Sequence, residues 1–350
     1  MDFSRPDNAR KINRLKVLDA LRKRDMSRAE LSRELLINKV SVSEITDALI
    51  KEGFVAQGPL DNSTQGRPAT ILSIEKNGGR VFSFIFSSSN VVASASDLKG
   101  NVLRYERFPN DDSLGEYIGS FVKKMTQDNP RVFGVTVIGT ENDIPKDVFP
   151  WPVIYKTKAE AQAKGEMGGR DDLKNTLFVS WGDEIEASWP KGGVLSIPSF
   201  GHMKVTKGIK CSCGGDGCLS AVASGRVIKE TTGINQYRRL LTEEKGLLAV
   251  DDVSSAMAFA LSEALQATGA DSVMITGEMS NMPKDLYASV EDKMRMALPP
   301  ERRSATVIKS EKADKALLEG AGLIALDEFF YHREILDKLY QIQLNSSFLL

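Results

Sequence analysis

The sequence predicts an α/β protein in two parts, a winged helix-turn-helix over residues 1–75 and a larger α/β body over residues 76–350. Three observations predict this division. Three short helical patterns and two β-like stretches open the chain, strand-like and helix-like runs alternate through the remainder, and positive charge is concentrated at the N-terminus. A length of 350 residues is also typical of two or three domains.

Composition and cysteine usage exclude several classes of protein. Hydrophobic residues make up 41% of the chain, which is typical of a soluble globular protein. No uninterrupted apolar run approaches the ~20 residues of a membrane span, and the polar start lacks the apolar core of a secretory signal. The three cysteines lie within eight positions, which excludes a framework of separated disulfides. We therefore expect a cytoplasmic protein with no membrane partner.

The N-terminal helices show their boundaries in the sequence. A first helix is expected over about residues 8–24, and Ser27 with Glu30 forms a capping box that starts a second helix. Asn38 is the expected N-cap of a third helix, and Gly53 ends that helix at the C′ position. The apolar residues of the third helix recur on one face, which is expected to be buried: Val42, Ile45 and Leu49.

Two β-like stretches, FVAQG and ATILSI, follow the third helix and are separated by a polar loop. Three short helices and a β-hairpin in this order describe a winged helix-turn-helix, whose third helix enters the major groove of DNA. Its predicted outward positions are Lys39, Ser41 and Ser43, with Thr46 and Asp47 as further candidates. Lys39 suits a phosphate, and serine hydroxyls donate to phosphates or to base edges.

Two arginines complete the predicted DNA-binding set. Arg67 lies between Gly66 and Pro68 in the loop of the hairpin, and this slim, extended tripeptide can place a guanidinium in a minor groove. An ordinary turn between strands explains the tripeptide equally well. The predicted DNA-binding residues are therefore Arg28, Lys39, Ser41, Ser43 and Arg67.

The charge distribution agrees with a nucleic-acid partner. The whole chain has a net charge of −1, but residues 1–39 carry eleven Lys/Arg against six Asp/Glu, an excess of five positive charges. A basic N-terminal segment on a slightly acidic body is typical of a nucleic-acid module joined to another domain. A solvated helical face is the alternative explanation of the charge alone.

Strand-like and helix-like runs alternate from residue 76 onward. Helices are expected at SLGEYIGSFVKKMTQ, KAEAQAKGEM and VSSAMAFALSEALQATG, and strands include RVFSFIFS, RVFGVTVIG, TLFVSWG and SVMITGE. This succession predicts two βββα-type lobes. Near the C-terminus, His332 is expected on an amphipathic helix with Phe329, Phe330 and Tyr331, as a surface or core-edge side chain rather than a ligand.

The stretch KCSCGGDGCLS holds all three cysteines, Cys211, Cys213 and Cys218, and His202 lies nine residues before the first of them. Thiolates and an imidazole are the ligands that tetrahedral Zn²⁺ prefers, and the intervening glycines permit tight turns. Four protein ligands leave no open coordination position, so the block predicts a structural zinc site rather than a hydrolytic centre. Free cysteines in a loop are the alternative.

The chain resembles the ROK family of repressors, open reading frames and sugar kinases over nearly its whole length. The likeness is carried by SRAELSREL, VSEITDALIKEGFV and GRPATIL at the front, by FGHM with CSCGGDGCLSAVASG in the middle, and by ALLEGAGLIALDEFF near the end. The resemblance implies an actin-like, ribonuclease H-like ATPase fold in two lobes behind the winged helix. It also implies zinc at the same four residues, next to a sugar pocket that the metal orders.

The resemblance also implies catalytic groups that this chain lacks. ROK kinases carry an Asn and a catalytic Asp before a helix, and Thr157 and Lys158 fall at these positions. A lysine does not replace a carboxylate base at neutral pH without a strongly depressed pKa. Ser199 and Ser220 stand where two sugar-contacting carboxylates are expected.

The phosphate loops differ from the family pattern as well. The first resembles Asp-x-Gly-Gly-Thr in the family, whereas this chain has three serines and an asparagine over residues 87–90. The second resembles Gly-Thr-Gly-Ile-Gly, whereas Asp183, Glu184 and Glu186 here place negative charge where phosphates bind. Each like-charge contact at about 4 Å costs ~1 kcal/mol in water. Glu278 also replaces a glycine of the adenosine turn, so we expect no sugar phosphorylation.

The leading hypothesis is a DNA-binding transcriptional regulator of ROK type, a repressor, and not an enzyme. Its kinase-like body would serve oligomerisation and the sensing of a sugar-like effector. A homodimer or homotetramer would match a palindromic operator in double-stranded DNA. The alternatives are an active sugar kinase with an atypical site and an interaction protein that never contacts DNA.

Overall fold

The computed structural model describes residues 6–61, 69–87, 89–128, 130–144, 148–168, 170–191, 195–197, 199–312, 314–332 and 335. The chain divides into two compact units, and each is described by itself. The first unit comprises Met1–Tyr155 with Gly322–Leu350, and the second comprises Lys156–Ala321. None of the helices in the described ranges is long and apolar enough to cross a membrane.

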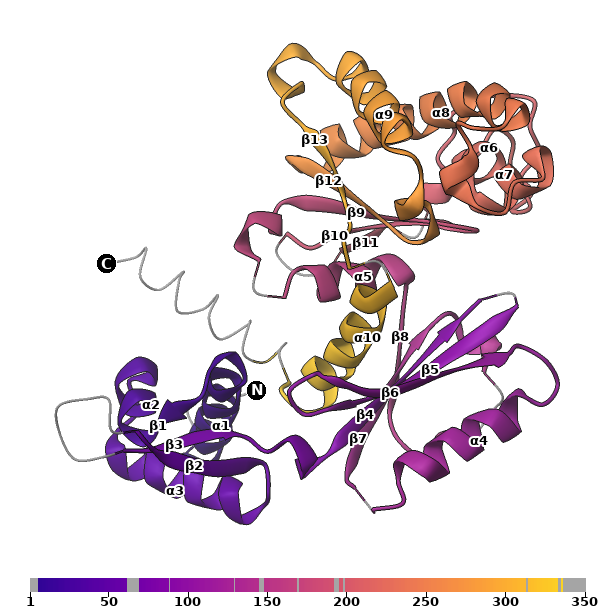
Figure 1. The fold of residues 1–350 in the computed structure, drawn as a ribbon. Coiled ribbons are helices and arrows are strands. Elements are labelled where there is room, and N and C mark those ends of the chain that lie inside the picture. The colour runs from indigo at the N-terminus through magenta and orange to yellow at the C-terminus, as the bar shows by residue number, and fades with distance from the viewer. Residues whose placement is uncertain are drawn as a thin grey trace. The chain divides into compact units, whose positions relative to one another are not determined.

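The first unit begins with three helices and a small sheet (Figure 1). The strands pair antiparallel in the order β1-β3-β2, so the three helices carry the hairpin wing of the predicted winged helix-turn-helix. Arg67, between the two strands of the wing, lies outside the described residues. The elements are α1 (Pro6–Lys23), β1 (Met26–Ser27), α2 (Arg28–Leu35), α3 (Lys39–Lys51), β2 (Val55–Asp61) and β3 (Ala69–Ile74).

Local hydrogen bonds confirm the predicted helix boundaries. The Ser27 hydroxyl accepts from the amide of Glu30, and the Glu30 carboxylate accepts from the amide of Ser27 at 2.7 Å. The Asn38 side chain accepts from the amide of Ser41 at 2.8 Å and so caps α3. Gly53 follows that helix with a φ of +75°, a conformation that glycine adopts without a steric penalty. These boundaries are therefore set by neighbouring residues.

A five-stranded sheet in the order β6-β5-β4-β7-β8 forms the rest of the first unit. Helix α4 (Leu114–Met125) packs against one face, where the rings of Phe82, Phe121 and Trp151 form an aromatic cluster. The sequence analysis missed the short edge strand β8. The strands are β4 (Arg80–Phe86), β5 (Asn90–Asp97), β6 (Val102–Pro109), β7 (Val132–Ile138) and β8 (Val153–Lys156).

The winged helix shares its hydrophobic core with this sheet. Phe54, just before β2, packs against Phe133 of β7 and against Phe330, with ring centroids 5.8 Å and 5.4 Å apart. Phe330 follows α10 (Asp314–Phe329), whose C-terminal half belongs to the same unit. Aromatic rings from three distant parts of the chain therefore stabilise the winged helix.

A polar contact joins the first and last helices of this core. The Arg22 guanidinium pairs with the Asp327 carboxylate and lies over the Tyr331 ring, 4.6 Å from its centroid. The Tyr331 hydroxyl donates to the carbonyl of Leu98 at 2.8 Å. The expectation that Phe330, Tyr331 and His332 lie on one helix with Phe329 is wrong, because α10 ends at Phe329 and His332 has a φ of +46°. His332 has an exposed side chain, as expected.

The second unit is built on a five-stranded sheet in the order β11-β10-β9-β12-β13. Here β9, β10 and β11 pair antiparallel, while β12 runs parallel to both β9 and β13. Both sheets have the same pattern: three consecutive strands pair antiparallel, and the first of the three also pairs with a later, parallel strand. This repetition is expected of two related lobes. The strands are β9 (Thr176–Trp181), β10 (Ile185–Trp189), β11 (Leu195–Ile197), β12 (Ser272–Thr276) and β13 (Thr306–Lys309).

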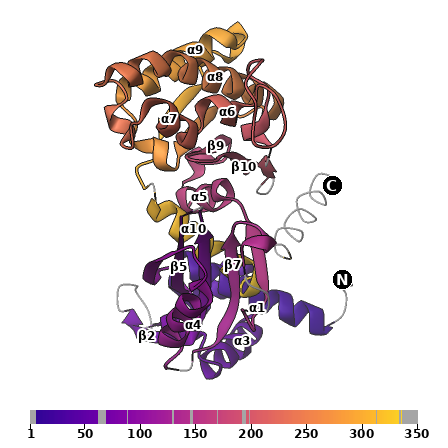
Figure 2. The same cartoon turned by 90° about the vertical axis from the view of Figure 1, so that its right-hand side faces the viewer.

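Helices cover both faces of this second sheet (Figure 2). Alternate residues of β9 serve the two faces, since Val179 packs in the core with α8 whereas Phe178 packs with Ala163 of α5. Helix α8 begins nine residues before its predicted start, and the sequence analysis missed α6, α7 and α9. The helices are α5 (Lys158–Glu166) on one face and α6 (Leu219–Ala223), α7 (Gly225–Thr232), α8 (Glu244–Thr268) and α9 (Lys284–Ala297) on the other.

Candidate functional site

Helix α3 carries the predicted DNA-binding residues near its N-terminal end. Lys39 and Val40 occupy the first two positions and are exposed, whereas Ser41 and Ser43 are half-buried. The opposite face of the helix is buried in the core of the winged helix, as predicted. The structure therefore brings Lys39, Ser41 and Ser43 to one end of one helix, with the lysine as the most accessible of the three.

Arg28 contacts α3 from the start of α2. Its Nε donates to the hydroxyl of Thr46 at 3.0 Å, and its guanidinium pairs with the exposed Asp47 carboxylate at 2.6 Å. Thr46 is fully buried, so its expected outward orientation is wrong. Arg28 neutralises an acidic group of α3 in this arrangement, and its contact with DNA stays a prediction.

The four predicted metal ligands lie together in the second unit. The ligand atoms of His202, Cys211, Cys213 and Cys218 are all within 4.8 Å of one another. Sγ of Cys213 lies 3.7 Å from Sγ of Cys218, and Sγ of Cys211 lies 3.7 Å from Nδ1 of His202. Tetrahedral zinc with Zn–S bonds of about 2.3 Å holds two sulfurs about 3.8 Å apart. The spacing and chemistry of these four side chains therefore fit a zinc ion.

Local hydrogen bonds and glycine turns shape residues 202–218, which we call the metal loop after its predicted ligands. The amide of Cys211 donates to the carbonyl of Gly215, and the amide of Gly214 donates to the carbonyl of Cys211, both at 3.0 Å. Gly217 has a φ of +74°, and a Cβ there would lie 1.8 Å from the carbonyl oxygen of Thr206. The loop therefore requires glycine at residue 217 to bring the last cysteine back toward the others.

The thiols of the cluster differ in pKa. The amide of Cys213 donates to the sulfur of Cys211 and lowers the pKa of the Cys211 thiol to about 6. Burial and the neighbouring sulfurs of Cys213 and Cys211 raise the pKa of Cys218 to about 11. Thiols packed this closely cannot all ionise unless a cation compensates the charge, and a coordinating metal deprotonates them outright. The set is suited to holding a metal.

The residues at the expected catalytic position have structural contacts. The Thr157 hydroxyl accepts from the amide of Glu160 at 3.2 Å and caps α5, and Lys158 is the half-buried first residue of that helix. Glu186 of β10 accepts from the amide of Ala159 at 3.3 Å. Burial raises the pKa of the Glu186 carboxyl. The sequence analysis placed Glu186 in a phosphate loop, whereas its carboxylate lies at the start of α5.

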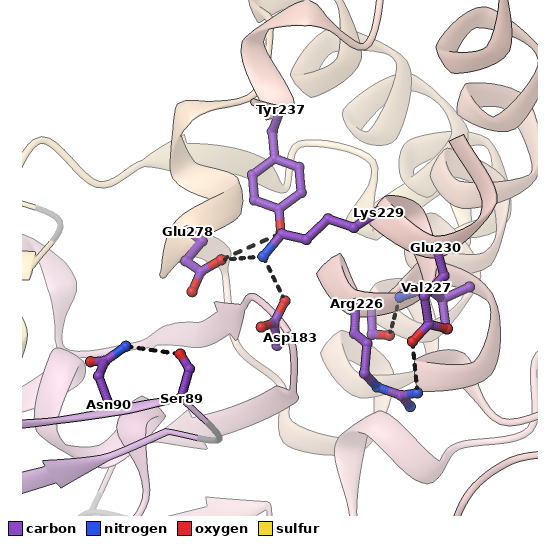
Figure 3. A network of polar contacts seen from close by, with 10 residues as sticks. Ser89, Asn90, Asp183, Arg226, Val227, Lys229, Glu230, Tyr237 and Glu278 are labelled. Carbon is purple, nitrogen blue, oxygen red and sulfur yellow. Dashed lines mark hydrogen bonds and ion pairs between the residues drawn. The ribbon is translucent and has the colours of Figure 1, made fainter. Parts of the chain in front are cut away.

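A lysine pairs with one acidic residue of the second phosphate loop and with Glu278 of the adenosine turn (Figure 3). Nζ of Lys229 lies 2.9 Å from Oδ1 of Asp183 and 3.2 Å from Oε2 of Glu278, and the Tyr237 hydroxyl donates to Glu278 at 3.3 Å. Although burial opposes it, hydrogen bonding to Tyr237 and Asp183 raises the pKa of Lys229. Lys229 of α7 is therefore a counter-ion for Asp183, and the sequence analysis missed it because the two residues are 46 positions apart.

Residues at the first phosphate loop close an ordinary turn. The hydroxyl of Ser87 donates to the carbonyl of Asn90 at 2.8 Å, and the Asn90 side chain donates to the hydroxyl of Ser89 at 3.1 Å. At the expected sugar-contacting positions, Ser199 is exposed and Ser220 is half-buried. None of these described side chains supplies a carboxylate.

The fold and the cluster define a class of protein, a two-lobed α/β protein of the actin-like type that carries a winged helix-turn-helix and a loop with a His–Cys₃ cluster. A comparison with protein families is consistent with this class. The ROK family profile matches residues 146–328, more than half of the chain, and the chain belongs to the ROK family.

Similar proteins include named regulators. The chain is 26% identical over 261 residues to the xylose repressor of Caldicellulosiruptor bescii, and the match covers 63% of this chain but only 65% of that relative. It is 22% identical to the DNA-binding transcriptional repressor Mlc of Escherichia coli K12, over 90% of this chain and 92% of Mlc. A crystal structure of a ROK family transcriptional regulator, a homolog of E. coli Mlc, has a TM-score of 0.72 at 20% identity. It covers 93% of this chain and 99% of its own, which confirms the predicted fold.

Proposed function

We propose that the protein is a DNA-binding transcriptional regulator of ROK type that acts as a repressor. The observation that carries the proposal is the winged helix-turn-helix, whose helix α3 exposes Lys39 at its N-terminal end. The names of the relatives support it. The partner is double-stranded operator DNA in the cytoplasm, and a homodimer or homotetramer presents paired α3 helices to a palindromic operator.

The body is proposed to hold a structural zinc ion and to sense a sugar-like effector. His202 and the three cysteines would bind the metal. The metal would stabilise the local fold, and its four protein ligands would leave no open coordination position. An effector regulates DNA binding when it has different affinities for DNA-competent and DNA-incompetent arrangements of the protein. The pseudo-kinase body therefore couples a small molecule to the operator without chemistry.

Replacing Lys39 with alanine is expected to weaken DNA binding and to flatten its salt dependence. Removing one ion pair between a side chain and a phosphate lowers the slope of log affinity against log salt by about 0.9. The measurement is fluorescence anisotropy over a salt series, on DNA recovered by genome-wide pull-down with the purified protein. Lys51→Ala is the matched control, because Lys51 lies about 18 Å further along the same helix and should leave the slope unchanged. Absence of any binding at low salt would reject the proposal.

No hexose or N-acetylhexosamine is expected to stimulate ADP release by this protein. Lys158 replaces the catalytic carboxylate, and Lys229 pairs with Asp183 of the acidic loop and with Glu278 of the adenosine turn. A coupled ADP-release assay over a panel of sugars measures this. Turnover that Glu186→Gln abolishes, and that Glu184→Gln two residues earlier leaves intact, would instead establish the alternative function of a sugar kinase with an atypical base.

A further inference from the structure

Two exposed apolar side chains lie where α2 leads into α3, one in the turn and one in the first turn of α3. Leu36 is 91% exposed and Val40 is 69% exposed, whereas Ile37 between them is 7% exposed and packs in the core. Among the large apolar side chains of the described residues, Leu36 is the most exposed. We call Leu36 and Val40 the apolar tip. Side chains this exposed contribute almost no burial to the folded monomer, so stability does not explain them.

The backbone at Leu36 makes this leucine costly as well as exposed. Leu36 follows α2 with φ 53° and ψ 37°, in the left-handed region. Glycine is the usual residue in this conformation after a helix and in helix-turn-helix connections, because a Cβ crowds the following carbonyl. Residues held in such conformations cluster at functional sites. The protein therefore keeps a strained, solvent-exposed leucine where glycine would fold more easily.

The surroundings of the apolar tip match DNA. Lys39 lies between its two members along the chain and is exposed, and the segment of residues 1–39 has an excess of five positive charges. The exposed face of α3 continues from Val40 through Ser43 and Glu44 at helical spacing. A duplex offers phosphates to the lysine and one apolar group in its major groove, the 5-methyl group of thymine.

The size of the apolar tip also favours DNA over a protein partner. A standard protein interface buries roughly 800 Å² on each partner, far more than two side chains supply. A thymine methyl is a single apolar group that one leucine or valine side chain can cover. We propose that Leu36 and Val40 contact thymine 5-methyl groups in the major groove and so determine which operators the protein binds. This inference rests on the proposed DNA-binding function and assigns specificity to residues outside the predicted set.

The test removes the methyl groups from the DNA without changing its sequence. Random duplexes are first selected with the full-length protein, and the bound pool is then amplified with either thymidine or deoxyuridine triphosphate. The wild type is expected to bind the uracil pool more weakly, by about fourfold for each contacted methyl. Lys39→Ala should keep this ratio, because a phosphate contact does not sense the methyl group.

A double variant and a control locate the effect. The L36G/V40A variant should bind both pools with equal, reduced affinity and keep the wild-type salt slope. Glycine adopts the left-handed conformation freely, so the thermal unfolding midpoint of the variant should not fall below that of the wild type. An unchanged midpoint excludes misfolding as the cause of the reduced affinity. Leu248→Ala is the matched control, because Leu248 is 74% exposed and lies on α8 in the other unit. This control should keep the wild-type ratio.

Each outcome decides between the two proposals. Equal wild-type affinity for the two pools overturns the methyl contact and leaves the DNA-binding function standing. If L36G/V40A keeps the methyl preference, the assignment to these residues is overturned. Full affinity of that variant for both pools would also overturn it, and this is the result expected if the apolar tip binds a protein. Failure of the wild type to select any DNA rejects the proposed function itself.

Discussion

Replacing Phe330 with alanine is expected to lower the free energy of unfolding of the first unit by about 3–5 kcal/mol, the usual cost of emptying a buried phenylalanine site. Phe330 is 6% exposed, and its ring centroid lies 5.4 Å from that of Phe54 and 4.8 Å from those of Phe133 and Tyr331. Because the winged helix contributes Phe54 to this cluster, the variant should lose DNA affinity although it is not altered at the DNA-binding helix.

Hydrogen exchange followed by mass spectrometry measures this effect unit by unit. In Phe330→Ala, the amides of α1 and α3 should exchange much faster, whereas those of α8 in the other unit should keep their protection. Met296→Ala is the control, because Met296 is 77% exposed and its loss should change stability by less than about 0.5 kcal/mol. Unchanged exchange in α1 and α3 would show that the winged helix is stable without the shared aromatic cluster.

Replacing Cys218 with serine is expected to abolish zinc binding and to unfold the metal loop. Structural zinc sites contribute an apparent binding free energy of about 10–16 kcal/mol at neutral pH, and that energy supports folding. Cys218 is buried, its sulfur lies 3.7 Å from that of Cys213, and it directly precedes α6. Losing this ligand should therefore free the loop and the start of that helix together.

Metal analysis and limited proteolysis check this prediction. Purified wild type should contain about one zinc ion per chain and resist cleavage between residues 203 and 217, and Cys218→Ser should do neither. Ser212→Ala is a matched control, since Ser212 is an exposed neighbour of two ligands and contributes no ligand atom to the cluster. Less than about half a zinc per chain in carefully purified wild type would contradict the site.

Features that depend on nearby residues could be predicted from the sequence. The capping box of Ser27 and Glu30, the Asn38 cap and the Gly53 end of α3 each involve residues a few positions apart, and all are confirmed. The metal loop is similar, because three of its ligands lie within eight positions and the glycines between them shape the turns. The fourth ligand, His202, could be added because it lies only nine residues before Cys211.

Features that depend on distant residues could not be predicted. The inward position of Thr46 could have been predicted, because it lies at helical spacing from the buried Val42 and Leu49, but the hydrogen bond from Arg28 that satisfies its hydroxyl comes from another helix. The Lys229 pairs with Asp183 and Glu278 join residues 46 and 49 positions apart. Helices α6 and α7 contain only five and eight residues, too few for a clear period.

The aromatic core that the winged helix shares with the rest of the first unit limits which segments can be exchanged between ROK regulators to change operator specificity. A chimera that exchanges residues 1–75 alone would separate Phe54 from Phe133 and Phe330. These two residues lie in separate parts of residues 76–350. A workable crossover must therefore transplant β7, which carries Phe133, and the segment around residues 322–331 together with the winged helix, or else graft only the exposed face of α3. Residues 1–75 and the segment around residues 322–331 are therefore expected to be exchanged together.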